Sequence, residues 1–273
     1  MLKYFLPLLL IASPIAAAAQ EQAPDQTYEA EIKRASQLGL LLYEFDSSAW
    51  VATDALRDKK KAWELYTEIA TPKGWTTTEV DKNRLRTAFI AELNGELVSV
   101  FDAETKGRKV KKKTTYPTGR PLTDAETVQY HAKRAFTAKD IEPCAEFLPM
   151  NAVVIPAPDG GVPYLYLMSA TKESNLVVLG RHFRFRVSED GKSLSEKTGF
   201  TNGCIGLSSA TLNGGTPVGL IISHLLTPYP QEHHVFASLA NDIPLFVTMP
   251  KTGTTWKVDG TSIEVFDMKK LGQ

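Results

Sequence analysis

The feature that most constrains this chain is an alternation of apolar and polar side chains over residues 182–187. Its apolar members, Phe183, Phe185 and Val187, point to one face of an extended chain, and a histidine and two arginines point to the other. A period of two is typical of a half-buried β-strand. The Asp-Gly pair at 190–191 then favours a two-residue hairpin turn. Because the returning strand has few apolar residues, we expect it to be an edge strand or to carry a β-bulge.

Two segments have the spacing of amphipathic helices. Residues 27–58 place apolar side chains at three- and four-residue steps, with charged residues between them. Thr123 and Glu126 have the spacing of a capping box, which indicates the start of a second helix that ends before Pro143.

Most of the remaining chain has the pattern of β-strands, and Asn94-Gly95 between two alternating runs is the strongest short hairpin signal. We expect strands near 63–70, 75–81, 85–93, 96–102, 151–155, 164–170, 176–187, 192–199, 204–207, 218–226, 235–240, 243–249, 254–258 and 262–266. No helical pattern separates the late strands, as a parallel crossover would require. The sequence therefore predicts an α+β fold with two amphipathic helices packed on largely antiparallel β-sheet.

The first 19 residues have the pattern of a secretory signal peptide. Lys3 precedes an apolar run, and three alanines at 17–19 form a small-residue cleavage pattern. No later apolar run is long enough for a membrane span. We therefore expect an exported, soluble protein, periplasmic if the source is a Gram-negative bacterium and secreted otherwise.

Composition changes most sharply in a basic segment that contains proline and glycine, residues 106–121. We interpret it as a linker between a helix with β-hairpins, 20–105, and a helix with an antiparallel β-rich half, 122–273, although the two halves also fit one continuous domain. The basic side chains are Lys106, Arg108, Lys109, Lys111, Lys112 and Lys113.

These basic residues have two interpretations. In the first they lie on a solvated loop or an edge strand, and in the second they bind an anionic component of the cell envelope. A nucleic acid is not expected, because Tyr116 is the only aromatic residue near them. The whole chain has 31 Lys+Arg and 31 Asp+Glu, so net charge favours no particular partner.

The chain has two cysteines, Cys144 and Cys204. An even number of cysteines in an exported chain favours a disulfide between them.

Residues 201–207 resemble the nucleophile motif of the L,D-transpeptidases, envelope enzymes in which a cysteine attacks a peptidoglycan stem peptide. The matching residues are Thr201, Gly203, Cys204 and Ile205, and the differing residues are Asn202 and Gly206, which stand where that family has histidine and arginine. The resemblance implies a divergent cysteine enzyme that acts on cell-wall peptides, with Cys204 as its nucleophile and His182 as the base that a thiol requires.

One candidate metal site consists of His224 and a short run later in the chain, Glu232, His233 and His234. If a strand begins here, adjacent histidines point to opposite faces and cannot ligate one ion without a bulge. His234 would then be a hydrogen-bonded core histidine. We therefore predict neither a metal nor a cofactor.

The leading hypothesis from the sequence is a non-catalytic envelope protein with a binding or scaffolding role, and the cysteine enzyme is the alternative. The two differ in the redox state of Cys204, because a disulfide would remove the candidate nucleophile.

Overall fold

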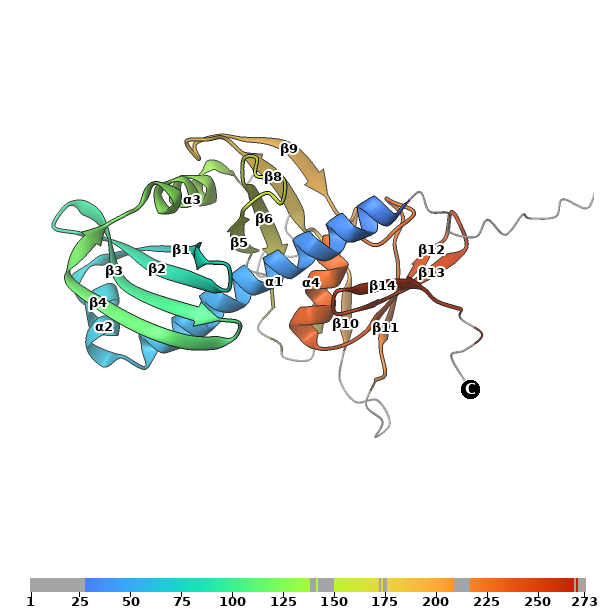
Figure 1. Ribbon diagram of the computed structural model, residues 1–273, viewed down its shortest axis with the longest axis horizontal. Coiled ribbons are helices and arrows are strands. Elements are labelled where there is room, and N and C mark those ends of the chain that lie inside the picture. The colour runs from blue at the N-terminus through green and yellow to red at the C-terminus, as the bar shows by residue number, and fades with distance from the viewer. Residues whose placement is uncertain are drawn as a thin grey trace, which may run out of the picture.

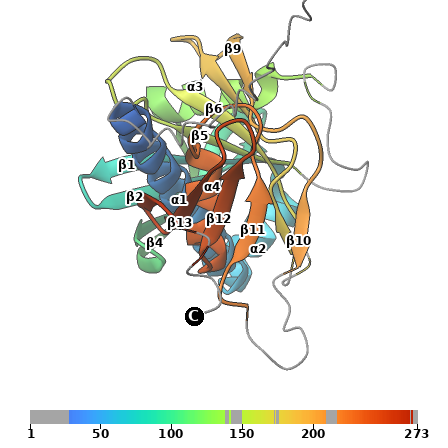
Figure 2. The ribbon, with the colours of Figure 1, turned by 90° about the vertical axis from the view of Figure 1, so that its right-hand side faces the viewer.

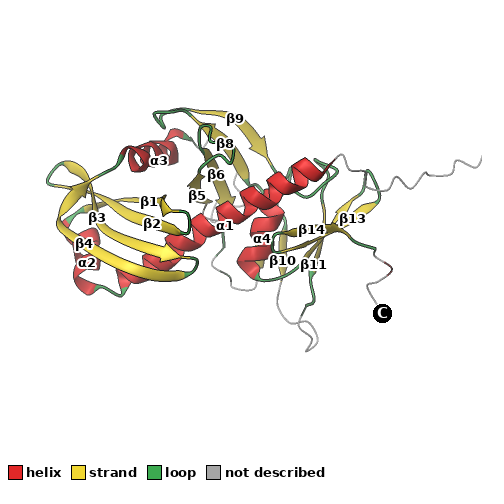
Figure 3. Ribbon diagram, in the orientation of Figure 1, coloured by secondary structure: helices red, strands yellow, loops and turns green. Residues whose placement is uncertain are grey.

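The structure is a computed structural model that describes residues 28–137, 141, 150–171, 173, 176–208, 217–267 and 269. Helices in the described residues are α1 (Glu29–Arg57), α2 (Lys60–Glu64), the π-helical η2 (Leu65–Ile69), α3 (Asp124–Ala135) and α4 (Glu232–Asn241) (Figures 1 and 3). Strands are β1 (Thr71–Asp81), β2 (Arg84–Leu93), β3 (Glu96–Lys106), β4 (Lys109–Pro121), β5 (Met150–Ile155), β6 (Tyr164–Ser169), β7 (Leu176–Val178), β8 (Phe183–Val187), β9 (Leu194–Gly199), β10 (Gly206–Ser208), β11 (Leu220–Ser223), β12 (Leu245–Met249), β13 (Thr254–Asp259) and β14 (Ser262–Val265). The predicted α+β class with mostly antiparallel sheet is confirmed, but the described residues contain two α-helices, α2 and α4, that were not expected.

Helix α1, predicted over 27–58, connects the three parts of the structure (Figure 1). Its 29 residues extend roughly 44 Å at ~1.5 Å per residue. Ile32 packs against the C-terminal core, Leu42 lies in the middle core, and Leu56 lies in the N-terminal core. One helix therefore contributes its apolar stripe to three hydrophobic clusters.

The N-terminal sheet is an antiparallel meander in the order β1-β2-β3-β4. Asn94 and Gly95, with φ of 54° and 83°, form the predicted tight turn between β2 and β3. The strand predicted at 63–70 is wrong, because this segment forms α2 and η2. Its aromatic residues favour strand locally, but Tyr66 instead packs edge-on against Phe89 of the sheet, with ring centroids 5.7 Å apart.

The basic segment 106–121, predicted as a linker, is largely strand β4, which pairs with β3 at the edge of the sheet. Lysines on an exposed edge strand prevent pairing with other chains, so a charged composition is compatible with a strand here. The sequence interpretation as an edge strand therefore describes this segment better than a linker does.

The middle sheet, in the order β5-β6-β8-β9, has a helix on each face. α1 covers one face through Leu42, and α3 covers the other through Ala132. All six residues of β6 are buried, as expected for a strand covered on both sides. β9 is an edge strand, and its register shifts near Glu196, where φ is 50°. The predicted edge position and bulge of the returning strand are both present.

The C-terminal sheet, in the order β11-β12-β13-β14, contains a parallel pair that the sequence did not predict. β11 and β12 run parallel, and α4 is the crossover between them (Figure 2). The strand predicted at 235–240 is therefore wrong. Val235 and Ala237 face the core of this sheet, and the helix ends at Asp242 in the left-handed conformation, with φ of 50°.

The proposed signal peptide, residues 1–19, lies outside the described residues. No helix within the described ranges combines the length and apolar character needed to cross a membrane.

Candidate functional site: a buried histidine cluster

Three histidines meet where β11 ends and α4 begins. His224 directly follows β11, and His233 and His234 lie in the first turn of α4. The carboxyl end of a parallel strand beside the start of its crossover helix is a frequent position for ligand sites in α/β units. The crossover that the sequence did not predict therefore brings three possible metal ligands together.

The three rings are in contact and almost fully buried. One ring nitrogen from each of the three residues lies within 4.8 Å of the others. The rings of His233 and His234 have centroids 3.7 Å apart, and those of His224 and His234 are 4.9 Å apart at 88°. His224 is 4%, His233 0% and His234 1% exposed. We call these three residues the histidine cluster.

The hydrogen bonds differ among the members of the cluster. His224 Nε2 lies 2.9 Å from Thr227 Oγ1 and 3.2 Å from the Thr227 amide. His234 Nδ1 accepts a hydrogen bond of 3.0 Å from the Gln231 amide. Both ring nitrogens of His233 are buried and have no hydrogen-bond partner among the described residues. His233 is therefore an exception to the rule that buried polar atoms are paired.

Burial keeps these imidazoles neutral. It lowers the pKa of His224 to about 4. The pKa values of His233 and His234 are lowered well below their usual range, first by burial and then by repulsion from the neighbouring rings. At neutral pH each ring therefore has one unprotonated nitrogen, which in His224 and His234 accepts a hydrogen bond from a backbone amide.

A fourth histidine, His182, lies next to the cluster and was the candidate base in the cysteine-enzyme hypothesis. Its ring centroid is 6.1 Å from that of His233. Nδ1 accepts a hydrogen bond from the Ser169 amide at 3.0 Å, and Nε2 donates to the Val178 carbonyl at 3.2 Å. Burial lowers the pKa of His182 to about 4. Both nitrogens are engaged with the backbone, so His182 is not positioned to activate a thiol.

A buried ion pair holds the start of α4 against the middle sheet. Glu232 pairs with Arg184 of β8 and accepts a hydrogen bond of 3.0 Å from the Tyr166 hydroxyl on β6. Tyr166 stacks on Phe200, and Phe200 contacts His233 with ring centroids 4.9 Å apart. These contacts fix the position of α4 where it presents the histidine cluster.

The candidate nucleophile, Cys204, is exposed and is not a free thiol. Cys144, the only other cysteine in the sequence, lies outside the described residues. The Cys144–Cys204 disulfide therefore stays a prediction.

The candidate anion-binding residues Lys106, Arg108, Lys109, Lys111, Lys112 and Lys113 are all exposed on the β3–β4 hairpin. Lys112 lies 3.8 Å from Glu104, and Arg108 lies over Trp50 at 5.4 Å. These two basic residues thus have local partners, and anion binding by the group stays a prediction.

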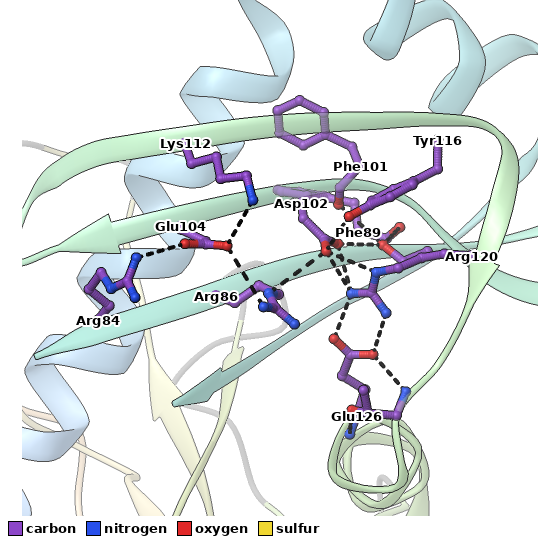
Figure 4. Close-up of polar contacts among 12 residues, drawn as sticks. Arg84, Arg86, Phe89, Phe101, Asp102, Glu104, Lys112, Tyr116, Arg120 and Glu126 are labelled. Carbon is purple, nitrogen blue, oxygen red and sulfur yellow. Dashed lines mark hydrogen bonds and ion pairs between the residues drawn. The ribbon is translucent and has the colours of Figure 1, made fainter. Parts of the chain in front are cut away.

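A second buried polar network, which the sequence reasoning missed, joins β3, β4 and α3 (Figure 4). Arg120 donates to both Asp102 oxygens, at 2.8 and 2.9 Å, and to both Glu126 oxygens, at 2.7 and 2.8 Å. Asp102 also accepts from Ser99 at 2.8 Å and from Tyr116 at 3.2 Å. Because its members satisfy one another, this network is structural. The capping box at Thr123 and Glu126 was predicted and is confirmed, but Arg120 as a partner of Glu126 was not.

No protein-family model matches this chain, and comparisons with curated proteins and with solved structures find no significant match.

We expect the free energy of unfolding to fall as the pH is lowered from about 7 to about 5. Because the folded pKa values of the buried histidines lie below 6.5, the unfolded chain takes up protons that the folded chain does not, so stability is complete above pH 6.5 and is lost as the pH falls toward 4. His182 and His224 would each account for on the order of 2 kcal/mol at pH 5. Two carboxyls act in the opposite direction, Asp46, whose pKa burial raises to about 6, and Glu44, whose pKa burial also raises, but they are two groups against four rings.

Urea denaturation at several pH values measures this dependence. His131→Ala, which removes a partly exposed histidine on α3, should leave the slope unchanged. Equal stability of the wild-type protein at pH 7 and pH 5 would contradict the burial of neutral histidines.

Proposed function

We propose that this protein is an exported, non-catalytic binding protein of the cell envelope and that the histidine cluster is its ligand site. The observation that carries this proposal is His233, which is fully buried, has no hydrogen-bond partner among the described residues and adjoins two further neutral histidines. Such a group is costly in the free protein and becomes favourable when a ligand pairs with it.

The features of the proposed cysteine site support a binding role over cysteine catalysis. Cys204 is not a free thiol, and both nitrogens of His182 are bonded to backbone groups. A cysteine nucleophile needs a thiolate and a nearby base. Neither requirement is met by these two residues.

We expect the native, unreduced protein to resist alkylation by iodoacetamide in denaturant, because a Cys144–Cys204 disulfide leaves no thiol. After reduction, mass spectrometry should show that both cysteines are modified, and Cys144→Ser should lower the thermal midpoint. Alkylation of Cys204 without reduction, together with an unchanged midpoint in Cys144→Ser, would refute the non-catalytic proposal and favour the cysteine enzyme.

A further inference from the structure

We propose that His224, His233 and His234 bind a single divalent transition-metal ion of the zinc class. This inference rests on the proposed function, because it identifies the ligand of the same site. It replaces the sequence expectation of no metal, which depended on placing His233 and His234 on a strand.

The first argument is the unpartnered state of His233. Its two nitrogens are completely buried without a hydrogen bond among the described residues, and the ring lies between His234 and Phe200. A structural histidine in such a position would normally donate one hydrogen bond and accept another, as His182 does. A metal ion would take the electron pair of one of these nitrogens, and the N–H of the other would keep no acceptor among the described residues.

The second argument is the convergence of three donors. The nitrogen atoms of a tetrahedral zinc site lie about 3.3 Å apart, given Zn–N bonds of about 2.0–2.1 Å. In the cluster the corresponding atoms lie within 4.8 Å of one another. The three donors therefore already lie close together, and a further approach of about 1–2 Å would bring them to the separation of a zinc site.

The third argument is that the hydrogen bonds of His224 and His234 identify the unprotonated nitrogen on each ring. The Thr227 amide donates to His224 Nε2 at 3.2 Å, so Nε2 holds the electron pair and the proton is on Nδ1. His234 accepts from the Gln231 amide at Nδ1, so its proton is on Nε2. A metal ion bound at His224 Nε2 and His234 Nδ1 would replace these two amides as the partner of each electron pair, with no change of tautomer.

The chemistry of the donors defines the class of ion. An all-imidazole set suits zinc, copper and nickel, whereas calcium and magnesium prefer oxygen ligands. His182 is not a fourth ligand, because both of its nitrogens are bonded to the backbone. Three protein ligands leave one coordination position for another group.

The test is isothermal titration calorimetry of the tag-free, chelator-treated protein with zinc, and with copper and nickel in parallel. We expect one ion per chain and a rise of the thermal midpoint by about 5–10 °C when free zinc is about 100 times Kd. His224→Ala and His233→Leu should each weaken binding by at least about 100-fold, because even residues that only orient a ligand contribute 10- to 100-fold.

His233→Leu should fold, so a loss of zinc binding in this variant would not be an effect of unfolding. No hydrogen bond to the part of the chain that the structure describes is lost in this variant, so its metal-free midpoint should equal or exceed that of the wild type. His131→Ala, on the opposite face of the middle sheet, is the matched control and should bind zinc like the wild type. As a second readout, the side-chain nitrogen NMR shifts of His224, His233 and His234 should change when zinc is added.

Unchanged zinc affinity in His233→Leu would overturn the assignment of the site. Absence of zinc, copper and nickel binding, with both cysteines unreactive before reduction, would overturn the metal inference but leave the non-catalytic binding role. One-to-one zinc binding that depends on His233, in a protein whose Cys204 alkylates freely, would support the metal site while refuting the non-catalytic role.

Discussion

Replacing Gly39 by alanine is expected to destabilise the protein by roughly 2–4 kcal/mol, although the same change inside an exposed helix would stabilise it by about 1 kcal/mol. The reason is the contact between α1 and α4. A Cβ atom at position 39 would lie 2.5 Å from Val235 Cβ and 2.7 Å from the Glu232 carbonyl oxygen. Because Val235 Cβ and a backbone oxygen cannot rotate away, α4 would have to shift as a unit.

Urea denaturation of Gly39→Ala measures this effect, and zinc titration of the same variant tests its consequence for the site. Glu232 directly precedes His233, so displacement of α4 should also weaken zinc binding. Gly203→Ala is the matched control, since a Cβ there meets no atom within 4 Å. An unchanged or higher stability of Gly39→Ala would contradict the close packing of α1 on α4.

Arg120→Ala is expected to reduce the free energy of unfolding by about 3–5 kcal/mol, the range for removing one partner of a buried ion pair. The side chains of Asp102 and Glu126 are 5% and 1% exposed, so Glu126 would remain buried without its counter-ion and Asp102 would keep only Arg86, at 3.9 Å. Burial raises the pKa of Glu126, but hydrogen bonds from Arg120 and Thr123 outweigh burial and lower it overall, so this carboxylate is charged at neutral pH.

Chemical denaturation at neutral pH measures the loss. Arg120→Lys should recover only part of the stability, because an ammonium group cannot make paired hydrogen bonds to two carboxylates. Lys60→Gln is the surface control, since its ion pair with Glu64 is 3.8 Å long and its side chain is 89% exposed, and it should change stability by less than about 0.5 kcal/mol. A similar effect of Arg120→Ala and Lys60→Gln would show that the network is not buried in solution.

The turns and helix ends that depend on a few adjacent residues were predicted correctly from the sequence. The Asn94-Gly95 turn and the capping box at Thr123 each depend on residues close together in the chain, and both are present. The long periodicity of α1 was also sufficient. In each case backbone preference and apolar pattern indicate the same structure.

The two segments wrongly predicted as strands are those in which tertiary packing determines the secondary structure. The run at 235–240 is short and apolar, so it fits a strand as well as a helix, and only its crossover position between parallel strands selects α4. The aromatic residues at 63–70 likewise favour strand locally but pack as helix against the N-terminal sheet.

The histidine cluster was missed as a consequence of the first error. His233 and His234 were recognised as possible ligands but were rejected because a strand would separate them. In the first turn of α4 their rings instead lie together beside His224. The spacing of Glu232-His233-His234 after a predicted strand and a proline-containing loop was the available signal, and helix was the assignment needed to use it.

The most direct test of the metal centre is anomalous diffraction from a crystal of the zinc-loaded protein, measured on both sides of the zinc absorption edge. The structure predicts one anomalous peak per chain, about 2.0–2.1 Å from a ring nitrogen of each of His224, His233 and His234. A map with no peak among these three rings, or with zinc bound only at the protein surface, would contradict it.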